Sequence, residues 1–353
     1  MAQGYINSRK NILTSLEPLR FGKDGRFKIL HLTDIHKIHP DMDDDEDRTV
    51  PENKSKNTLY TIEKAIELTE PDLVVFGGDN IGGHWDEMTD EYVLWCLGNI
   101  IGSVKKFNVP LAIVFGNHDG QNEHISQLLN KEIQMSLYME YGNFRGCFNE
   151  ADVYGCGNYH LPVLAHDSDE VQWNVWCFDS NDYPRRPDGS VISYDEEALH
   201  ADQLKWYENT VKAEKEKFGR TVPAVAFQHI PLNQVHDFIE ECSEAESDYE
   251  HREKFFRAKE GAVIEGLLRE KPCTPKKDRN ELEAWKRGGD IKAAFFGHDH
   301  TNTFRMDIDG ISLYQTLKCG YETYGSEHGG RLITLFENSD KYTTETIVIE
   351  PEY

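Results

Sequence analysis

Short apolar runs alternate with helical patterns through the first 300 residues. Six runs rich in β-branched or aromatic residues read as buried strands, at 27–32, 73–76, 111–115, 171–178, 224–227 and 293–296. Between the first two runs, Leu59, Ile62 and Ile66 recur on one helical face before Pro71 ends the pattern. Further helices are expected around 93–104, 122–140, 196–217 and 251–269. This alternation predicts an α/β fold with largely parallel strand pairing.

From about Thr303 the pattern changes to successive strands, at 303–308, 311–317, 331–336 and 342–350. Neither an internal repeat nor a low-complexity linker divides the chain. We therefore predict a single domain over 1–353. Its parts are an extended lead-in at 1–20, a motif-bearing region at 27–300, a helical insertion near the cleft at 233–290, and C-terminal strands at 303–350.

Polar side chains follow five of the predicted strands where each one ends. The tetrapeptides at these ends are TDIH, GGDN, GNHD, QHIP and GHDH, and their metal-competent residues are Asp34, His36, Asp79, Asn117, His229, His298 and His300. Ligands bind beyond the carboxyl ends of strands in open α/β sheets. Each motif alone is common, and His229 alone reads as a satisfied core histidine. The five together, in one order, predict one shared site.

The chemistry of these seven donors points to a pair of metal ions. They are carboxylates, an amide and imidazoles, with no cysteine, which suits Mn, Fe, Zn, Co or Ni better than a structural zinc site. Seven donors are too many for one tetrahedral ion and fit two ions that share a bridging ligand. Paired ions of this kind assist in-line displacement at phosphorus.

Composition narrows the expected partners and location. The formal net charge of −25, from 38 basic and 63 acidic residues, disfavours nucleic acid and anionic membranes as partners. It favours a small phosphoester, or a phosphoprotein with basic flanks, as substrate. Seven cysteines without a CxxC motif predict reduced thiols and a cytoplasmic location, with a Cys147–Cys156 bridge left open. No apolar run is long enough to span a membrane.

The acidic segment DMDDDED at 41–47 is expected to be a solvated loop. Its spacing is superficially that of a calcium-binding loop. The sixth position, however, is Glu46 where the sharp turn of such a loop needs glycine.

The five strand-end motifs resemble those of the calcineurin-like metallophosphoesterases. The resemblance covers Phe27 to His300 with every motif in order. The lead-in LRFGKDGRFKILHLTDIH, the block WNVWCFDSNDY and the late GYETYG are further similar to the small purple-acid-phosphatase-like phosphatases of plants and fungi. The implied fold is a four-layer α/β/β/α sandwich, in which two mixed β-sheets are flanked by helices and the site lies at one edge.

The resemblance also implies a role for each motif residue. The first metal would be held by Asp34, His36 and His300, the second by Asn117, His229 and His298, and Asp79 would bridge both. A hydroxide shared by the metals would attack phosphorus, His118 would protonate the leaving oxygen as the general acid, and Asp119 would orient His118 or raise its pKa. Thr33 and Asp299 would support the loops.

The chain departs from purple acid phosphatases at two positions. Those enzymes place a tyrosine three residues after the bridging aspartate, where this chain has Gly82, and their first motif ends in glycine where this chain has His36. We therefore expect no tyrosinate charge-transfer band and no fixed need for ferric iron.

Nothing in the motifs identifies the substrate. Candidate contacts are His84, Asn181, Tyr183 and Tyr321, together with Arg185 and Arg186, although each is more commonly an ordinary loop residue. We expect a phosphomonoesterase. The alternatives are a phosphodiesterase acting on a nucleotide or lipid head group, a non-catalytic scaffold with the same fold, and a purely structural metal site.

Overall fold

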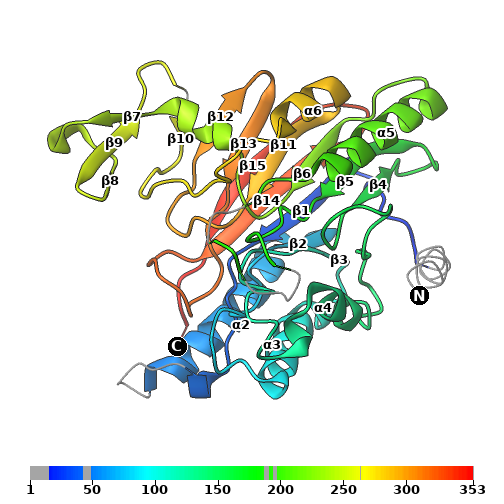
Figure 1. The fold of residues 1–353 in the computed structure, drawn as a ribbon. Coiled ribbons are helices and arrows are strands. Elements are labelled where there is room, and N and C mark those ends of the chain that lie inside the picture. Colours follow the sequence, from blue (N-terminus) through cyan, green and yellow to red (C-terminus); the bar gives the residue numbers. More distant parts are fainter. Residues whose placement is uncertain (1–15, 43–48, 187–190, 194–196, 263, 353) are drawn as a thin grey trace.

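The computed structural model describes residues 16–42, 49–186, 191–193, 197–262 and 264–352, and these form two large β-sheets packed face to face with helices outside them (Figure 1). The described helices are α2 (Thr49–Thr69), α3 (Asp90–Lys105), α4 (Lys131–Tyr138), α5 (Ala201–Phe218) and α6 (Glu281–Gly288), with 3-10 turns η1 (Pro40–Met42), η2 (Gln127–Leu129), η3 (Asn233–Phe238) and η4 (Glu244–Glu246). The described strands are β1 (Arg26–Leu32), β2 (Leu73–Gly77), β3 (Leu111–Val114), β4 (Tyr159–Leu164), β5 (Val171–Cys177), β6 (Ala224–Phe227), β7 (Ile239–Cys242), β8 (Tyr249–His251), β9 (Lys254–Ala258), β10 (Ile264–Glu265), β11 (Ile291–Phe296), β12 (Arg305–Ile308), β13 (Ile311–Gln315), β14 (Gly329–Phe336) and β15 (Tyr342–Val348).

Both large sheets have a parallel centre, with antiparallel strands at one edge of the first sheet and at both edges of the second. The first has the order β15-β14-β1-β2-β3, in which β1, β2 and β3 are parallel and β14 joins antiparallel. The second has the order β10-β12-β13-β11-β6-β5-β4, in which β5, β6, β11 and β13 are parallel. The predicted four-layer sandwich of two mixed sheets is confirmed, and the six apolar runs all form strands.

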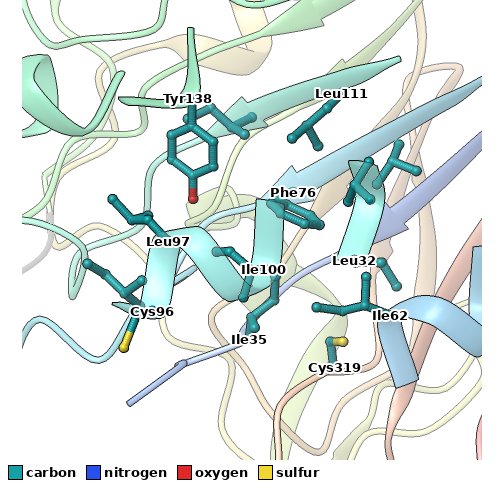
Figure 2. Close-up of a cluster of buried hydrophobic side chains, with 14 of the residues drawn as sticks. Leu32, Ile35, Ile62, Phe76, Cys96, Leu97, Ile100, Leu111, Tyr138 and Cys319 are labelled. Atoms are coloured by element: carbon teal, nitrogen blue, oxygen red, sulfur yellow. The ribbon is translucent and has the colours of Figure 1, made fainter. Parts of the chain in front are cut away.

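Three apolar layers hold the sandwich together. Between the sheets, Ile29 and Val75 of the first sheet pack in one cluster with Phe227 and Phe295 of the second. Side chains alternate along a strand, so the neighbours of these residues face outward. On the outer face of the first sheet, Figure 2 shows Leu32 and Phe76 beside Ile62 of α2 and Ile100 of α3. A third cluster places α5 and α6 against the second sheet.

Helix α3 illustrates how local sequence sets these layers. Its N-cap Thr89 accepts a hydrogen bond from the Tyr92 N–H at 3.3 Å, which satisfies one of the free donors of the first turn. Its buried face carries Val93, Leu97 and Ile100, at the helical spacing that the sequence predicts. The amphipathic pattern therefore fixes which side of α3 packs on the sheet.

The segment 233–290 is not the predicted helical insertion. It forms η3, η4, the small sheet β7-β9-β8 and β10, and its one α-helix is α6 at the end. The helix expected at 251–269 is wrong: Lys254–Ala258 is a strand, and Gly261 and Gly266 follow at φ 82° and 87°, which interrupts a helix. The phenylalanines of β9 satisfy a strand pattern as well as a helical one, so periodicity alone misleads here.

Several expectations concern residues at the margins of the described chain. Residues 1–15 of the predicted lead-in and 43–48 of the acidic loop lie outside the described residues. All seven cysteines lie inside them and are thiols, Cys147 and Cys156 included. Among the described helices, none combines the length and apolar character that crossing a bilayer requires.

Candidate metal centre

The five strand-end motifs meet at one edge of the sandwich, although they come from two different sheets. Asp34 follows β1, and both of its carboxylate oxygens accept the His298 N–H, at 3.0 Å each, from the loop after β11. His229 follows β6, and its Nε2 lies 3.2 Å from Oδ2 of Asp79, which follows β2. The parallel strands therefore carry their polar ends to the same place, as the sequence predicts.

The site contains two groups of side chains with metal-ligand geometry. One group is Asp34, His36 and His300, and the other is Asp79, His229 and His298; within each group the ligand atoms lie within 4.8 Å of one another. The groups adjoin, because His36 Nε2 lies 3.4 Å from Asp79 Oδ2. Asp79 thus belongs to the second group and also reaches a residue of the first, as a bridging ligand would.

Buried polar atoms show that the pocket suits cations. Asp79 Oδ2, Asn117 Oδ1 and His229 Nε2 are buried and have no hydrogen-bond partner within the described part of the chain. Buried acceptors without donors are costly unless something satisfies them. Convergent carboxylate, amide and imidazole acceptors are the surroundings that divalent metal ions require, so the residues present fit a pair of ions.

Neighbouring groups aim these acceptors inward. His229 Nδ1 lies 2.9 Å from the Gly77 carbonyl oxygen, so Nδ1 carries a proton and Nε2 is turned towards the site, where an ion could take the place of a second proton. Asn117 Nδ2 donates to the Tyr183 hydroxyl at 2.8 Å, which directs Oδ1 to the other side. Thr323 Oγ1 lies 3.0 Å from Nδ1 of His300 and fixes that ring in the same way.

Four of the seven predicted ligands have a left-handed backbone. The φ angles are 51° at Asp34, 45° at His36, 50° at Asp79 and 78° at His298. Such angles are strained for residues other than glycine and cluster at functional sites. Gly297 is required for a different reason, since a Cβ there would lie 1.9 Å from Thr33 Oγ1.

Electrostatics keep the two central carboxylates ionised. Burial raises the pKa of Asp34, but hydrogen bonding and charge from His300 and His229 outweigh it and lower the pKa to about 2. Asp79 is likewise buried, yet His229 and His118 hold its pKa well below the usual range. Both side chains therefore offer negative charge to a cation.

His118 faces the centre, but its orienting partner differs from the prediction. Its Nε2 lies 4.0 Å from Asp79 Oδ2, and its Nδ1 lies 2.6 Å from Oε1 of Gln121. Asp119 instead accepts backbone N–H groups of Asn80, Ile81 and Gly116, at 2.8, 3.1 and 2.8 Å. The prediction that Asp119 orients His118 is therefore wrong: Asp119 ties together the loops after β2 and β3, and Gln121 holds the imidazole.

The candidate substrate contacts divide into two pairs. His84 lies beside His118, with ring centroids 4.4 Å apart, and burial together with His118 lowers the pKa of His84 to about 4. Tyr183 reaches the centre through Asn117. Asn181 instead donates to the Ala198 carbonyl oxygen at 3.1 Å, and Tyr321 stacks on His328 with centroids 3.4 Å apart. Those two contacts are structural.

Arg185 and Arg186 form hydrogen bonds within the protein, and Gly82 is closely packed. Arg185 pairs with Asp182 at 3.0 Å and donates to the Gln121 carbonyl oxygen at 3.4 Å, so it supports the loop of His118. Arg186 donates to the Val191 carbonyl oxygen at 3.1 Å. A Cβ at Gly82 would lie 2.4 Å from Ile38 Cγ2, so a tyrosine there has no room.

Sequence reasoning missed three residues at the site: Gln121, Thr323 and Tyr324. The Tyr324 ring stacks on His300 with centroids 4.2 Å apart, its side chain is 57% exposed, and its hydroxyl donates to Glu270 at 2.7 Å. Thr323 and Tyr324 belong to the GYETYG block, which contributed to the family resemblance, but sequence reasoning assigned these two residues no function. Gln121 carries no such signal.

Comparison with known proteins identifies the class that this fold and site define. The family model described as calcineurin-like phosphoesterase matches residues 27–302. The chain therefore belongs to the calcineurin-like phosphoesterase family.

Related sequences are named as purple acid phosphatases and as a phosphatase. The chain is 26% identical to "Probable inactive purple acid phosphatase 14" of Arabidopsis thaliana over 338 residues, which are 90% of this chain and 77% of the relative. It is 25% identical to "Phosphatase DCR2" of Saccharomyces cerevisiae over 300 residues, 84% of this chain and 48% of the relative.

Two solved structures share the fold at low identity. A dimetal phosphatase from Danio rerio aligns with a TM-score of 0.55 and 13% identity, over 91% of this chain and 98% of that one. GAP50, described as the anchor in the inner membrane complex of Plasmodium, aligns with a TM-score of 0.51 and 11% identity, over 93% and 87%.

Proposed function

We propose that this protein is a phosphomonoesterase with two metal ions, one on Asp34, His36 and His300 and one on Asn117, His229 and His298, bridged by Asp79. The observation that carries the proposal is the adjacency of the two donor groups, joined at Asp79 by a distance of 3.4 Å to His36, with Nε2 of His118 facing the same carboxylate. The ions would be Mn, Fe, Zn, Co or Ni.

Bound ions would supply Lewis acidity and an activated water. The chain's own side chains do the rest. His118, 26% exposed at the centre, holds a proton on Nε2 for the leaving oxygen, while Gln121 fixes the other ring nitrogen. Tyr183 positions Asn117, and His84, beside His118, lies where it can contact a phosphate oxygen or the leaving group. The substrate would be a small phosphomonoester or a phosphoprotein.

Two alternatives give different readouts. A phosphodiesterase would use the same donors on a diester. A scaffold role has two observations in its favour: three relatives carry the word inactive in their names, and GAP50 is described as an anchor. Against it, this chain keeps all seven donors and His118, and its buried acceptors converge.

The test combines metal content with turnover on one sample. Metals are counted by mass spectrometry, and hydrolysis of p-nitrophenyl phosphate and bis-p-nitrophenyl phosphate is measured before and after addition of Mn or Zn. We expect about two metals per chain and faster monoester turnover. Faster diester turnover would favour the phosphodiesterase. Neither metal nor turnover, in folded protein, would favour the scaffold.

A further inference from the structure

A cavity lies between the two large sheets, at the edge formed by β15 of the first sheet and by β10 and β12 of the second. It has a volume of about 730 Å³ and is lined by residues of β12 and β13 on one side and of β14 and β15 on the other. The lining residues used below are Arg305, Tyr314, Arg331, Tyr342, Thr344 and Thr346, and the carboxylates of Glu265, Asp340 and Glu345 also line the cavity. The predicted metal-site residues are not among those that line it.

The inner face of the sandwich is polar at this edge. On β14, Arg331 shares a face with Ile333 and Leu335, which belong to the central apolar cluster. On β15 the residues paired with these three positions are Thr346, Thr344 and Tyr342. Sandwich interiors are normally apolar. Here the inner face of the edge strand β15 carries hydroxyl groups in place of apolar side chains.

Arg331 brings a positive charge into this row without a counter-charge. Its side chain is buried, at 5% exposure, and Nη2 donates to the carbonyl oxygens of Gln315 and Thr303 at 3.0 and 3.4 Å. Nη1 lies 3.5 Å from Thr344 Oγ1, and Nε is buried with no hydrogen-bond partner in the described residues. Within those residues no carboxylate lies within ion-pair distance of Arg331. Burial lowers its pKa to about 10, so the charge remains at neutral pH.

Arg305, which lines the same cavity, differs from Arg331 in having carboxylate partners. Arg305 also faces Tyr314, but it pairs with Asp307 at 2.9 Å and with Glu265 at 3.3 Å. The Arg331 guanidinium lies 5.1 Å from the Tyr314 ring centroid, so within the described residues its charge faces that ring and neutral hydrogen-bond acceptors, but no carboxylate. A buried charge is costly unless it is paired. An anion with several oxygens would supply the missing partner.

We propose that this cavity binds a phosphate-type oxyanion, with Arg331 as its counter-charge and the hydroxyl groups of Thr344, Thr346 and Tyr342 as hydrogen-bond donors. Guanidinium groups match phosphate oxygens in geometry and charge. The anion is either inorganic phosphate or the phosphate group of a larger molecule. The proposal does not depend on the proposed activity, because the cavity shares no side chain with the metal centre.

The test counts phosphate sites in the metal-loaded protein. Radiolabelled inorganic phosphate is equilibrated by dialysis against wild type, Arg331→Met and Lys212→Met. Lys212 lies exposed on α5, so its replacement removes the same charge elsewhere. We expect Arg331→Met to bind one phosphate fewer than wild type, or to bind it at least 10-fold more weakly, and Lys212→Met to match wild type. This difference holds whether or not the metal centre itself binds phosphate, so it separates this proposal from the proposed function.

Equal phosphate binding by wild type and Arg331→Met would overturn the site. Circular dichroism verifies that the variant folds. If it does not, Thr344→Val and Thr346→Val, which keep the charge and the shape, take its place; a several-fold weaker affinity supports the site, and unchanged affinity overturns it. Competition separates the sources: displacement by phenylphosphonate, whose C–P bond a phosphatase does not cleave, indicates the phosphate group of a larger molecule, and displacement by sulfate but not by phenylphosphonate indicates the free ion.

Discussion

Nδ1 of His118 lies 2.6 Å from Oε1 of Gln121, three residues further along the same loop. The amide oxygen can only accept, so Nδ1 carries one proton, and the proton proposed for the leaving oxygen is a second one, on the Nε2 atom that faces Asp79. This contact, rather than the adjacent Asp119, sets the direction in which the imidazole points.

Replacing Gln121 with leucine should therefore slow proton delivery without removing the acid. We expect kcat for phenyl phosphate to fall about 10-fold, less than the 100-fold or more that a general acid contributes. The loss should be smaller for p-nitrophenyl phosphate, whose leaving group needs less protonation. Gln127→Leu, an exposed glutamine on the same segment, is the control. Equal losses for both esters would contradict the role of Gln121.

Tyr183, a candidate substrate contact, forms a hydrogen bond with Asn117, a proposed metal ligand. Its hydroxyl accepts from Asn117 Nδ2 at 2.8 Å, so Tyr183→Phe frees the amide to rotate. Loss of such a supporting contact costs about 10-fold to 100-fold in metal affinity. We expect one of two ions to be lost on dialysis against dilute chelator, as in Asn117→Ala, while Tyr154→Phe retains both. An unchanged metal content with a raised KM would mean that Tyr183 contacts substrate.

Lys37 and Glu322 form an ion pair whose side chains are 0% and 2% exposed. Lys37 directly follows His36, and Glu322 directly precedes Thr323, which contacts His300. The ion pair therefore ties together the two chain segments that position two ligands of the first proposed metal. Glu322→Gln should lower the free energy of unfolding by about 3 kcal/mol, because it leaves a buried charge unpaired. Urea denaturation measures this.

The double variant Lys37→Met with Glu322→Met tests whether the loss of stability in Glu322→Gln comes from the unpaired Lys37 charge. It removes both charges and should recover most of that stability. Additive destabilisation in the double variant would show that the two side chains act independently.

His160 predicts a pH dependence of stability. Burial lowers its pKa, but Glu150 at 2.7 Å and Glu214 at 3.3 Å outweigh burial and raise the pKa to about 10. A raised pKa stabilises the folded state fully below pH 6.5, and this contribution is lost as the pH rises towards 10. His160→Gln should cost about 1–2 kcal/mol at pH 6 and much less at pH 10.

Denaturation curves at the two pH values check this prediction. His124→Gln, an exposed histidine, should show no such difference. A loss for His160→Gln that is the same at both pH values would show that packing, rather than charge, is what His160 contributes.

Metal removal should destabilise the protein. The ionised Asp34 and Asp79 lie in one buried site, and ions bound there stabilise only the folded state. At a hundredfold excess over the dissociation constant, each ion adds about 2.7 kcal/mol. Chelator should lower the melting temperature by calorimetry, and added Mn or Zn should restore it. Asp79→Asn should show a smaller shift; an equal shift would place the ions elsewhere.

The sequence by itself determined the strands, their polar ends and the family. Residue alternation and the glycine turns are local properties, so runs such as 27–32 and 293–296 and the motifs that follow them are readable without a structure. Six of the seven predicted ligands form two adjoining groups, because parallel strands carry their carboxyl ends to one edge. That geometry is general, and it requires no knowledge of side-chain packing.

Only the tertiary structure decided which neighbours support these residues. Gln121 rather than Asp119 holds His118, and Lys37 reaches Glu322 across 285 positions of the chain, because loop packing sets these contacts. The same is true of segment 233–290, where Phe255 and Phe256 suit a strand or a helix until their surroundings choose. Arg331 gives no signal in sequence either, because only strand pairing shows that it lies buried beside hydroxyl and carbonyl groups, with no carboxylate partner among the described residues.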